Sequence, residues 1–221
     1  MPDICVLQGK ISLHGVVLAG GKSTRMGRDK AKLTFQGQDL VARAVNVLTS
    51  CCTSVWISGR DAADHGLPNP WFMDQAPGKG PLRGILTALK HIQHPCMFLP
   101  CDIPLMTPEV INQLVQIYEH RPTGTLRVDF KQQETGFIEA LVAIYDPGCI
   151  PYIEQALAQQ QFKVARAVPE NRCIHVPYSI ATDSRPFLNI NYPEDLALLK
   201  KAGNDTFCLL PSPKKSRFSN K

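Results

Sequence analysis

The feature that most constrains this chain is a series of short apolar runs separated by stretches with helical periodicity. The runs are GVVLAG at 15–20, SVWIS at 54–58, CMFLPCD at 96–102 and FIEALVAIY at 137–145. Short apolar runs of this kind are typical of buried strands, and helices between them are typical of βαβ units. The sequence therefore predicts an α/β fold with a largely parallel sheet.

The spacing of apolar residues also predicts the elements between these runs. A small strand and turn, KLTFQGQ, precede a helix expected over about 39–50, and a second helix is expected over about 81–92. A third helix is expected after Thr107, where a capping residue, Pro108 and Glu109 form a typical first turn. The remaining expected elements are a helix over about 149–160, short strands near 173–177 and 186–190, and a helix from Pro193 to about 202.

The segment LAGGKSTRMGRDK at 18–30 contains GGKST, which resembles the end of a P-loop. A P-loop needs a glycine five positions before its Gly-Lys pair, and this chain has Val16 there. The segment is instead a buried strand that runs into a glycine pair followed by several cations. Glycines allow backbone N–H groups to approach an anion closely, so Arg25 and Lys30 are candidate phosphate ligands. The alternative is that both are solvated surface charges.

Length and composition limit the classes of protein that need to be considered. A chain of 221 residues suits one α/β domain, expected over 1–203, and the basic tail at 204–221 is expected to be disordered. The net charge of +5 does not imply nucleic-acid binding, although it suits an anionic substrate. No signal-peptide pattern opens the sequence, and no run approaches the ~18 apolar residues of a membrane helix. A cytoplasmic protein that binds no membrane is expected.

Cysteine and histidine patterns indicate neither a zinc site nor a nucleophilic enzyme. The eight cysteines form no C-x-x-C pair, and the six histidines are scattered, with no evident serine or cysteine partner. We expect the cysteines to be reduced thiols.

If the nucleophile is a phosphate monoester, it needs no general base, because its second pKa of about 6 leaves it ionised near neutral pH. Positioning and charge neutralisation by a metal are then sufficient for catalysis.

Polar residues follow several of the apolar runs, and ligands of open parallel sheets bind outside the carboxyl ends of the strands. Asp102 suits a Mg²⁺ ligand, because magnesium prefers one or two carboxylates with substrate phosphates; the alternative is a turn or helix-capping residue. Asn189 and Asn191 could complete a metal-binding or sugar-binding edge of the site. The alternative is that they form hydrogen bonds to the backbone of their own loop. Asp74 precedes the glycine-rich APGKGPLRG, which either wraps a base or ribose or is merely a turn.

Taken in order, LAGGKSTRMGRDK, GPLRG, LPCDIP and FLNINYPEDL resemble the MobA family of molybdenum cofactor guanylyltransferases, over about residues 15–200. The resemblance implies a Rossmann-like nucleotidyltransferase fold. It also implies transfer of GMP from GTP to the terminal phosphate of the molybdopterin cofactor, with release of pyrophosphate and Mg²⁺ as the metal. Implied partners are the two substrates and the proteins that deliver the cofactor or mature molybdoenzymes.

The resemblance also assigns roles to individual residues. Arg25 would stabilise the departing pyrophosphate, Lys30 would contact the phosphates, and Asp102 would bind magnesium. Asp74 matches the GTP-binding aspartate of the family, and the nucleotide would meet the backbone at residues 18–20. The full set of implied nucleotide- or cofactor-binding residues is Leu18, Ala19, Gly20, Gly21, Lys30, Ser58, Asp74, Gly80, Pro81, Leu82, Asp102, Asn189 and Asn191.

The chain departs from the family pattern in three places. Ser58 stands where asparagine is common, and Tyr192 stands where a capping threonine is usual. The segment RPTGTLRVDFKQQETG at 121–136 matches no family motif and is expected near the pterin side. Alternatives are a cytidylyltransferase that uses CTP on the same cofactor, a sugar-phosphate nucleotidyltransferase, and an inactive nucleotide-binding regulator. LAGG and GPLRG favour guanine, and the intact catalytic residues favour an enzyme.

Overall fold

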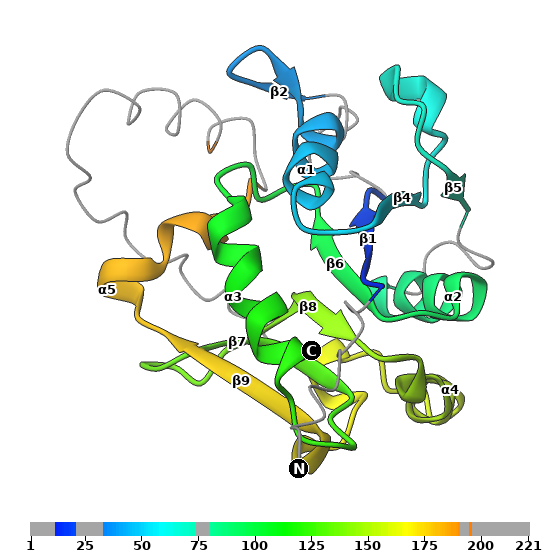
Figure 1. The fold of residues 1–221 in the computed structure, drawn as a ribbon, viewed down its shortest axis with the longest axis vertical. Helices are drawn as coiled ribbons and strands as arrows, with labels where there is room; N and C mark the ends of the chain where they lie inside the picture. The colour runs from blue at the N-terminus through cyan, green and yellow to red at the C-terminus, as the bar shows by residue number, and fades with distance from the viewer. Residues whose placement is uncertain (1–11, 21–32, 74–79, 191–194, 196–221) are drawn as a thin grey trace, which may run out of the picture.

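The computed structural model of the chain describes residues 12–20, 33–73, 80–190 and 195 (Figure 1). Some of the sequence predictions lie outside these residues and keep the status of predictions. They concern Gly21, Arg25, Lys30, Asp74, Asn191 and Tyr192, the helix from Pro193, and the tail at 204–221.

A seven-stranded sheet forms the centre of the described structure, in the order β5-β4-β1-β6-β8-β7-β9. All pairs of neighbours are parallel except β6 with β8 and β8 with β7, so the predicted α/β fold is confirmed. The strands are β1 (His14–Leu18), β4 (Ser54–Ser58), β5 (Trp71–Phe72), β6 (Cys96–Pro100), β7 (Arg127–Gln132), β8 (Ile138–Tyr145) and β9 (Cys173–Tyr178).

The antiparallel strand β8 follows from a hairpin that the sequence patterns did not reveal. Residues 121–136 contain β7, whose sequence RVDFKQ carries charged residues at alternate positions. A turn then leads straight into β8, and strands joined by so short a turn must run antiparallel. The apolar run at 137–145 is therefore a strand, as predicted, and it runs against its neighbour β6.

Most of the predicted helices are present. They are α1 (Leu40–Thr49), α2 (Pro81–Ile92), α3 (Pro108–Glu119) and α4 (Ile150–Ala158). The predicted strand near 186–190 is wrong, because Arg185–Phe187 forms the 3₁₀ helix η6, in which Phe187 stacks on Tyr178. The smaller elements are β2 (Thr34–Phe35), β3 (Gln38–Asp39), η2 (Ala62–His65), η3 (Pro147–Cys149), η4 (Val164–Arg166), η5 (Glu170–Arg172) and α5 (Ile180–Asp183).

Helices cover both faces of the sheet, and alternate strand residues supply the two cores. Val17 and Leu99 pack with α1 and α3, whereas Val16 and Phe98 pack with α2 and α4. At Gly15 the helix α1 comes so close that an added Cβ would lie 3.0 Å from Leu48 Cβ. The three-layered arrangement fixes β1 and β6 in the middle of the molecule.

The helix starts show how the local sequence ends one element and begins the next. Asp39 caps α1, because its carboxylate accepts hydrogen bonds from the N–H groups of Val41 and Ala42 at 2.8 and 3.1 Å. Thr107 occupies the predicted cap position of α3, but its side chain makes no capping bond. The neighbouring Thr107 hydroxyl lowers the pKa of the Glu109 carboxyl.

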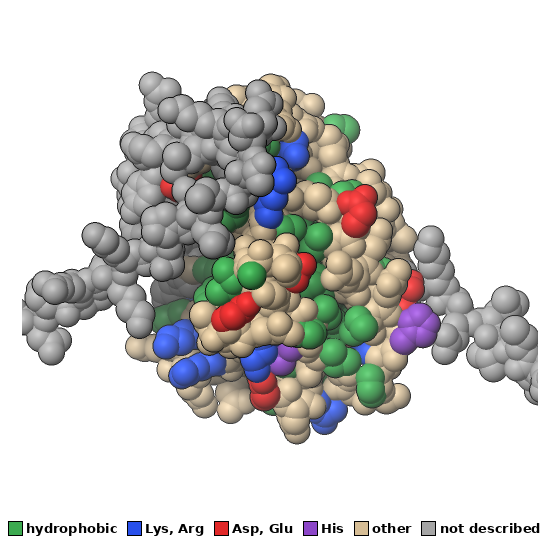
Figure 2. Space-filling model, turned by 90° about the vertical axis from the view of Figure 1, so that its left-hand side faces the viewer, with side chains coloured by type: hydrophobic (Ala, Val, Ile, Leu, Met, Phe, Trp, Pro, Cys, Tyr) green, Lys and Arg blue, Asp and Glu red, His purple; other side chains and the backbone are tan. Residues whose placement is uncertain are grey.

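The described surface carries charges of both signs. Figure 2 shows lysine and arginine side chains interspersed with acidic ones on one face, with apolar side chains between them. No described helix is long and apolar enough to cross a membrane. No disulfide joins the six cysteines within the described residues, which are Cys51, Cys52, Cys96, Cys101, Cys149 and Cys173.

Candidate functional site

The strand order of the sheet reverses between β1 and β6. From β1 the chain passes through α1 to β4 on one side, whereas the chain through α2 reaches β6 on the other side of β1. Ligands of open α/β sheets bind at such a switch point, outside the carboxyl ends of the strands. The ends of β1 and β6, and the loops that follow them, are therefore the candidate site, which we call the carboxyl rim.

Backbone hydrogen bonds hold the end of β1 in place. The Leu18 carbonyl accepts from Cys101 N–H at 3.3 Å, and Ala19 N–H donates to the Ser58 carbonyl at 3.0 Å. The Ala19 carbonyl accepts from Arg60 Nε at 2.8 Å. Gly20, the last described residue before the predicted anion-binding turn, is exposed. Hydrogen bonds thus hold the backbone of Leu18 and Ala19, the first two of the predicted nucleotide contacts.

The backbone at Asp102 and the residue after Asn189, which are far apart in the sequence, are joined at this rim. Asp102 follows β6 directly, between the buried residues Cys101 and Ile103, and is itself partly exposed. Its carbonyl accepts from the N–H of Ile190 at 2.8 Å, and Ile190 is fully buried. Asn189, next to that hydrogen bond, is exposed. The structure therefore brings together two residues that the sequence analysis placed at the same edge.

The described residues around Asp102 do not form a complete metal site of protein side chains. Within the described residues, no three His, Cys, Asp or Glu side chains come together in a group that could hold a metal. Mg²⁺ is often held by one or two carboxylates while substrate phosphates and water supply the other oxygens. A single carboxylate such as Asp102 is compatible with that mode of binding.

The start of α2 forms a third part of the rim. Gly80 has φ +79° and precedes Pro81 at the first helical position, which is the local reason the helix begins there. Leu82 is fully buried in the core, so only its backbone is left for the predicted contact. The free N–H groups of a helix start and its dipole favour electron-rich ligand atoms.

Arg60, which the sequence analysis did not name, lies near the rim, whereas Ser58, a predicted contact, is buried. Ser58 is only 2% exposed, and its carbonyl is already bonded to Ala19. Arg60, two residues later, is partly exposed and reaches across to the end of β1. The available signal was its position, because it is the first cation after the carboxyl end of a parallel strand.

The rim continues past Asp102 onto β8, β7 and β9, where the sequence analysis expected 121–136 near the pterin side but named no contact residue. The Tyr178 hydroxyl donates to Glu139 Oε1 at 2.7 Å, and Tyr178 is 5% exposed. Burial raises the pKa of the Glu139 carboxyl, although the Tyr178 hydrogen bond opposes the shift. The pKa of Tyr178 is also raised, first by burial and then by Glu139.

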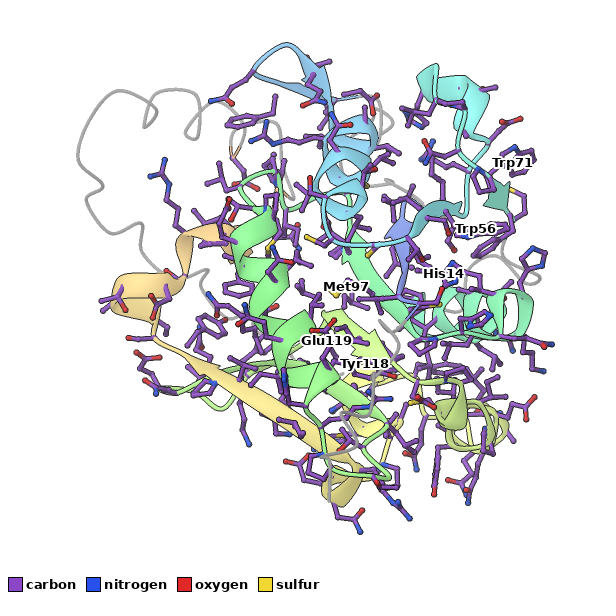
Figure 3. The ribbon with its side chains drawn as sticks, in the orientation of Figure 1. His14, Trp56, Trp71, Met97, Tyr118 and Glu119 are labelled. Atoms are coloured by element: carbon purple, nitrogen blue, oxygen red, sulfur yellow. The ribbon has the colours of Figure 1, made fainter. Side chains whose placement is uncertain are left out.

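One histidine does pair with a serine, contrary to the sequence prediction. His14 Nδ1 and Ser54 Oγ are 2.7 Å apart, and Trp56 Nε1 donates to the same hydroxyl at 3.2 Å (Figure 3). Burial, and then the neighbouring His94, lower the pKa of His14. Both residues begin their strands, so the pair lies at the amino edge of the sheet, away from the rim.

The fold and the rim define a Rossmann-like, nucleotide-binding class of α/β protein. Residues 15–173 match the MobA-like NTP transferase domain, so the chain belongs to that family and is a nucleotidyltransferase.

Similar proteins support this assignment. A probable molybdenum cofactor guanylyltransferase from Pelotomaculum thermopropionicum is 32% identical over 189 residues, covering 82% of this chain and 89% of that protein. A molybdenum cofactor biosynthesis bifunctional protein from Synechocystis sp. is 31% identical over 199 residues. That match covers 83% of this chain and 52% of the relative, so the chain spans about half of that protein.

The fold also matches solved structures. The crystal structure of molybdopterin-guanine dinucleotide biosynthesis protein A from Archaeoglobus fulgidus superposes with a TM-score of 0.68. It is 24% identical, and the match covers 85% of this chain and 97% of that one.

Proposed function

We propose that the protein transfers GMP from GTP to the terminal phosphate of the molybdopterin cofactor, forming the guanine dinucleotide and pyrophosphate. The observation that carries the proposal is the position of Asp102 beside the switch point, tied through Ile190 to the exposed Asn189. Relatives that match most of this chain bear the name molybdenum cofactor guanylyltransferase, which supports the same reaction.

The proposed reaction requires little proton transfer by the protein. An oxygen of the cofactor's terminal phosphate attacks the α-phosphorus of GTP, and the bond from that phosphorus to the bridging oxygen breaks. Pyrophosphate leaves with the bonding electrons, and no proton has to move, because the attacking phosphate is already ionised near neutral pH. The protein's task is to align the two phosphates and to neutralise their charge.

Asp102 would hold Mg²⁺, which when bound neutralises phosphate charge. Lys30 would contact the phosphates, Arg25 would stabilise the leaving pyrophosphate, and Asp74 would bind GTP. These three residues lie outside the described residues, so their roles rest on the family pattern.

The start of α2 would meet the base. Gly80 and Pro81, with the backbone of Leu82, lie at the rim on the far side of β1 from Asn189. GPLRG and LAGG favour guanine over cytosine there. A cytoplasmic location, and partners that deliver the cofactor or receive the product, stay predictions.

The test measures pyrophosphate release with Mg²⁺ and molybdopterin, supplying GTP or CTP in parallel. Asp102→Asn keeps the side-chain shape but removes the charge, and we expect it to lower the rate by at least about 100-fold. Asp64→Asn, at an exposed position in η2, is the matched control and should leave the rate unchanged. Thermal unfolding checks that both variants fold.

Each outcome of this test has a clear meaning. GTP-dependent release that is lost only in the Asp102 variant supports the proposal. Release with CTP instead would show that the base assignment is wrong, and full activity of Asp102→Asn would refute the metal role.

A further inference from the structure

An exposed aromatic residue stands where the β7–β8 hairpin reaches the carboxyl rim. Phe137 is 59% exposed, although its carbonyl accepts from Gln132 N–H at 2.8 Å and its own N–H bonds Thr135. The hairpin is fixed to β9, because Gln133 N–H donates to the Tyr178 carbonyl at 3.0 Å. A large apolar side chain on a well-tied backbone is available to a ligand.

Glu139 lies on the same face of the strand as Phe137. Both residues flank Ile138, which pairs with Lys131, and successive strand side chains point to opposite faces. Glu139 Oε1 accepts from Tyr178, and among the described residues Oε2 has no hydrogen-bond partner. A carboxylate has about four acceptor sites, so this one, held by Tyr178, has capacity left for a ligand.

Phe137 and Glu139 lie on the side of Asp102 that faces away from β1. Because β8 runs antiparallel to its neighbour β6, the start of β8 lies at the end of β6 that leads into Asp102. Tyr178 stacks on Phe187 with ring centroids 4.3 Å apart, and Ile190, three residues later, bonds Asp102. The start of α2 lies across β1 from this region.

We propose that Phe137 and Glu139 bind the pterin ring of the second substrate, Phe137 by stacking and Glu139 by accepting its N–H groups. The proposal rests on the proposed function for the identity of that substrate. A pterin presents a ring N–H beside an exocyclic amino group, and a carboxylate can accept from both. Its flat heterocycle can also stack on an exposed aromatic ring.

The direct test uses free pterin as the probe, titrated against the intact protein and followed by pterin fluorescence. Lumazine is the matched control ligand, because it has an oxygen in place of the amino group of pterin. We expect it to bind more weakly than pterin. Glu139→Gln still accepts from Tyr178 but loses the charge, and it should weaken pterin binding by about 10-fold or more. Phe137→Leu should weaken it by about 3- to 10-fold.

The controls are chosen away from the rim. Glu119→Gln changes an exposed glutamate at the last position of α3 (Figure 3), and Phe162→Leu changes a phenylalanine that is 44% exposed. Both should bind pterin normally. In the transfer assay, Glu139→Gln and Phe137→Leu should raise the KM for molybdopterin by the same factors, while the KM for GTP stays constant.

The outcomes separate this proposal from the proposed function. Transfer activity with an unchanged molybdopterin KM in both variants would overturn the subsite and leave the function standing. If wild type shows no transfer, the pterin titration still decides. Weaker pterin binding by Glu139→Gln than by wild type supports the subsite. The subsite is overturned if wild type binds no pterin, if Glu139→Gln binds pterin as tightly as wild type, or if lumazine binds as tightly as pterin. Because Phe137 is exposed, its variant remains informative even if Glu139→Gln unfolds.

Discussion

Asp129→Ala should be among the most destabilising single substitutions in the described structure, because it leaves a buried arginine without its counter-ion. Arg127 and Asp129 are both 0% exposed, and Arg127 Nε lies 2.6 Å from Asp129 Oδ2. The other carboxylate oxygen lies 2.5 Å from His175 Nδ1. Burial raises the pKa of Asp129, while Arg127 and His175 act in the opposite direction and favour its ionised form.

The magnitude follows from what remains after the carboxylate is gone. Arg127 keeps one hydrogen bond, from its NH1 group to the Ala165 carbonyl at 3.2 Å, which does not neutralise a buried guanidinium. Removing one partner of a buried ion pair costs about 3–5 kcal/mol, against a total stability of about 5–15 kcal/mol for a typical domain. The variant is therefore expected to unfold at a much lower urea concentration.

Equilibrium urea unfolding of wild type, Asp129→Ala, Arg127→Met and the double variant gives the coupling between the two residues. We expect the double variant to be less destabilised than the sum of the singles, because it leaves no charge unpaired. A loss below about 1 kcal/mol in Asp129→Ala would refute the reasoning, since that is the range of a solvent-exposed pair. Additive losses would show that the two charges do not depend on each other.

Two further predictions concern packing and pH. Gly15→Ala should destabilise the fold by about 1–3 kcal/mol in urea unfolding, because the new Cβ would lie 3.0 Å from Leu48 Cβ; unchanged stability would mean that α1 shifts freely. Hydrogen bonds from the Ser179 hydroxyl and then from Ile180 N–H lower the pKa of Glu134 below its ordinary value. Its stabilising effect should therefore be present above the unfolded pKa and decline as pH falls through the lower folded pKa. The difference in melting temperature between wild type and Glu134→Gln should shrink with acidification, and a constant difference would contradict this.

The region proposed to bind the nucleotide carries local sequence signals. A buried strand that ends in glycines, a Gly-Pro helix start and an aspartate after a strand each occupy a few consecutive residues. The start of α2 follows directly from Gly80 and Pro81. Local patterns do not encode strand direction, however, so the antiparallel course of β8 was missed.

The individual contacts proposed for the pterin could not be predicted, because they depend on long-range strand pairing. Arg127 and Asp129 lie on a buried face of β7. Charged residues at alternate positions do not indicate a buried strand in the sequence, and only the structure shows that these two form an ion pair. Glu139 interrupted an apolar run and was the one available signal, but its partner Tyr178 lies on β9. The predicted strand near 186–190 failed for a similar reason, because Phe187 packs on Tyr178 and Phe130 in a 3₁₀ turn.

The regions proposed to bind the nucleotide and the pterin are joined by contacts at the proposed position of GMP transfer. Phe187 packs on the tyrosine that holds Glu139, and three residues further on Ile190 N–H holds the carbonyl of Asp102. A short chain segment thus sets the position of the proposed metal ligand relative to the proposed pterin contact. Since near-attack geometry is sensitive to displacements of about 1 Å, packing at Phe187 should influence the transfer rate without touching either substrate.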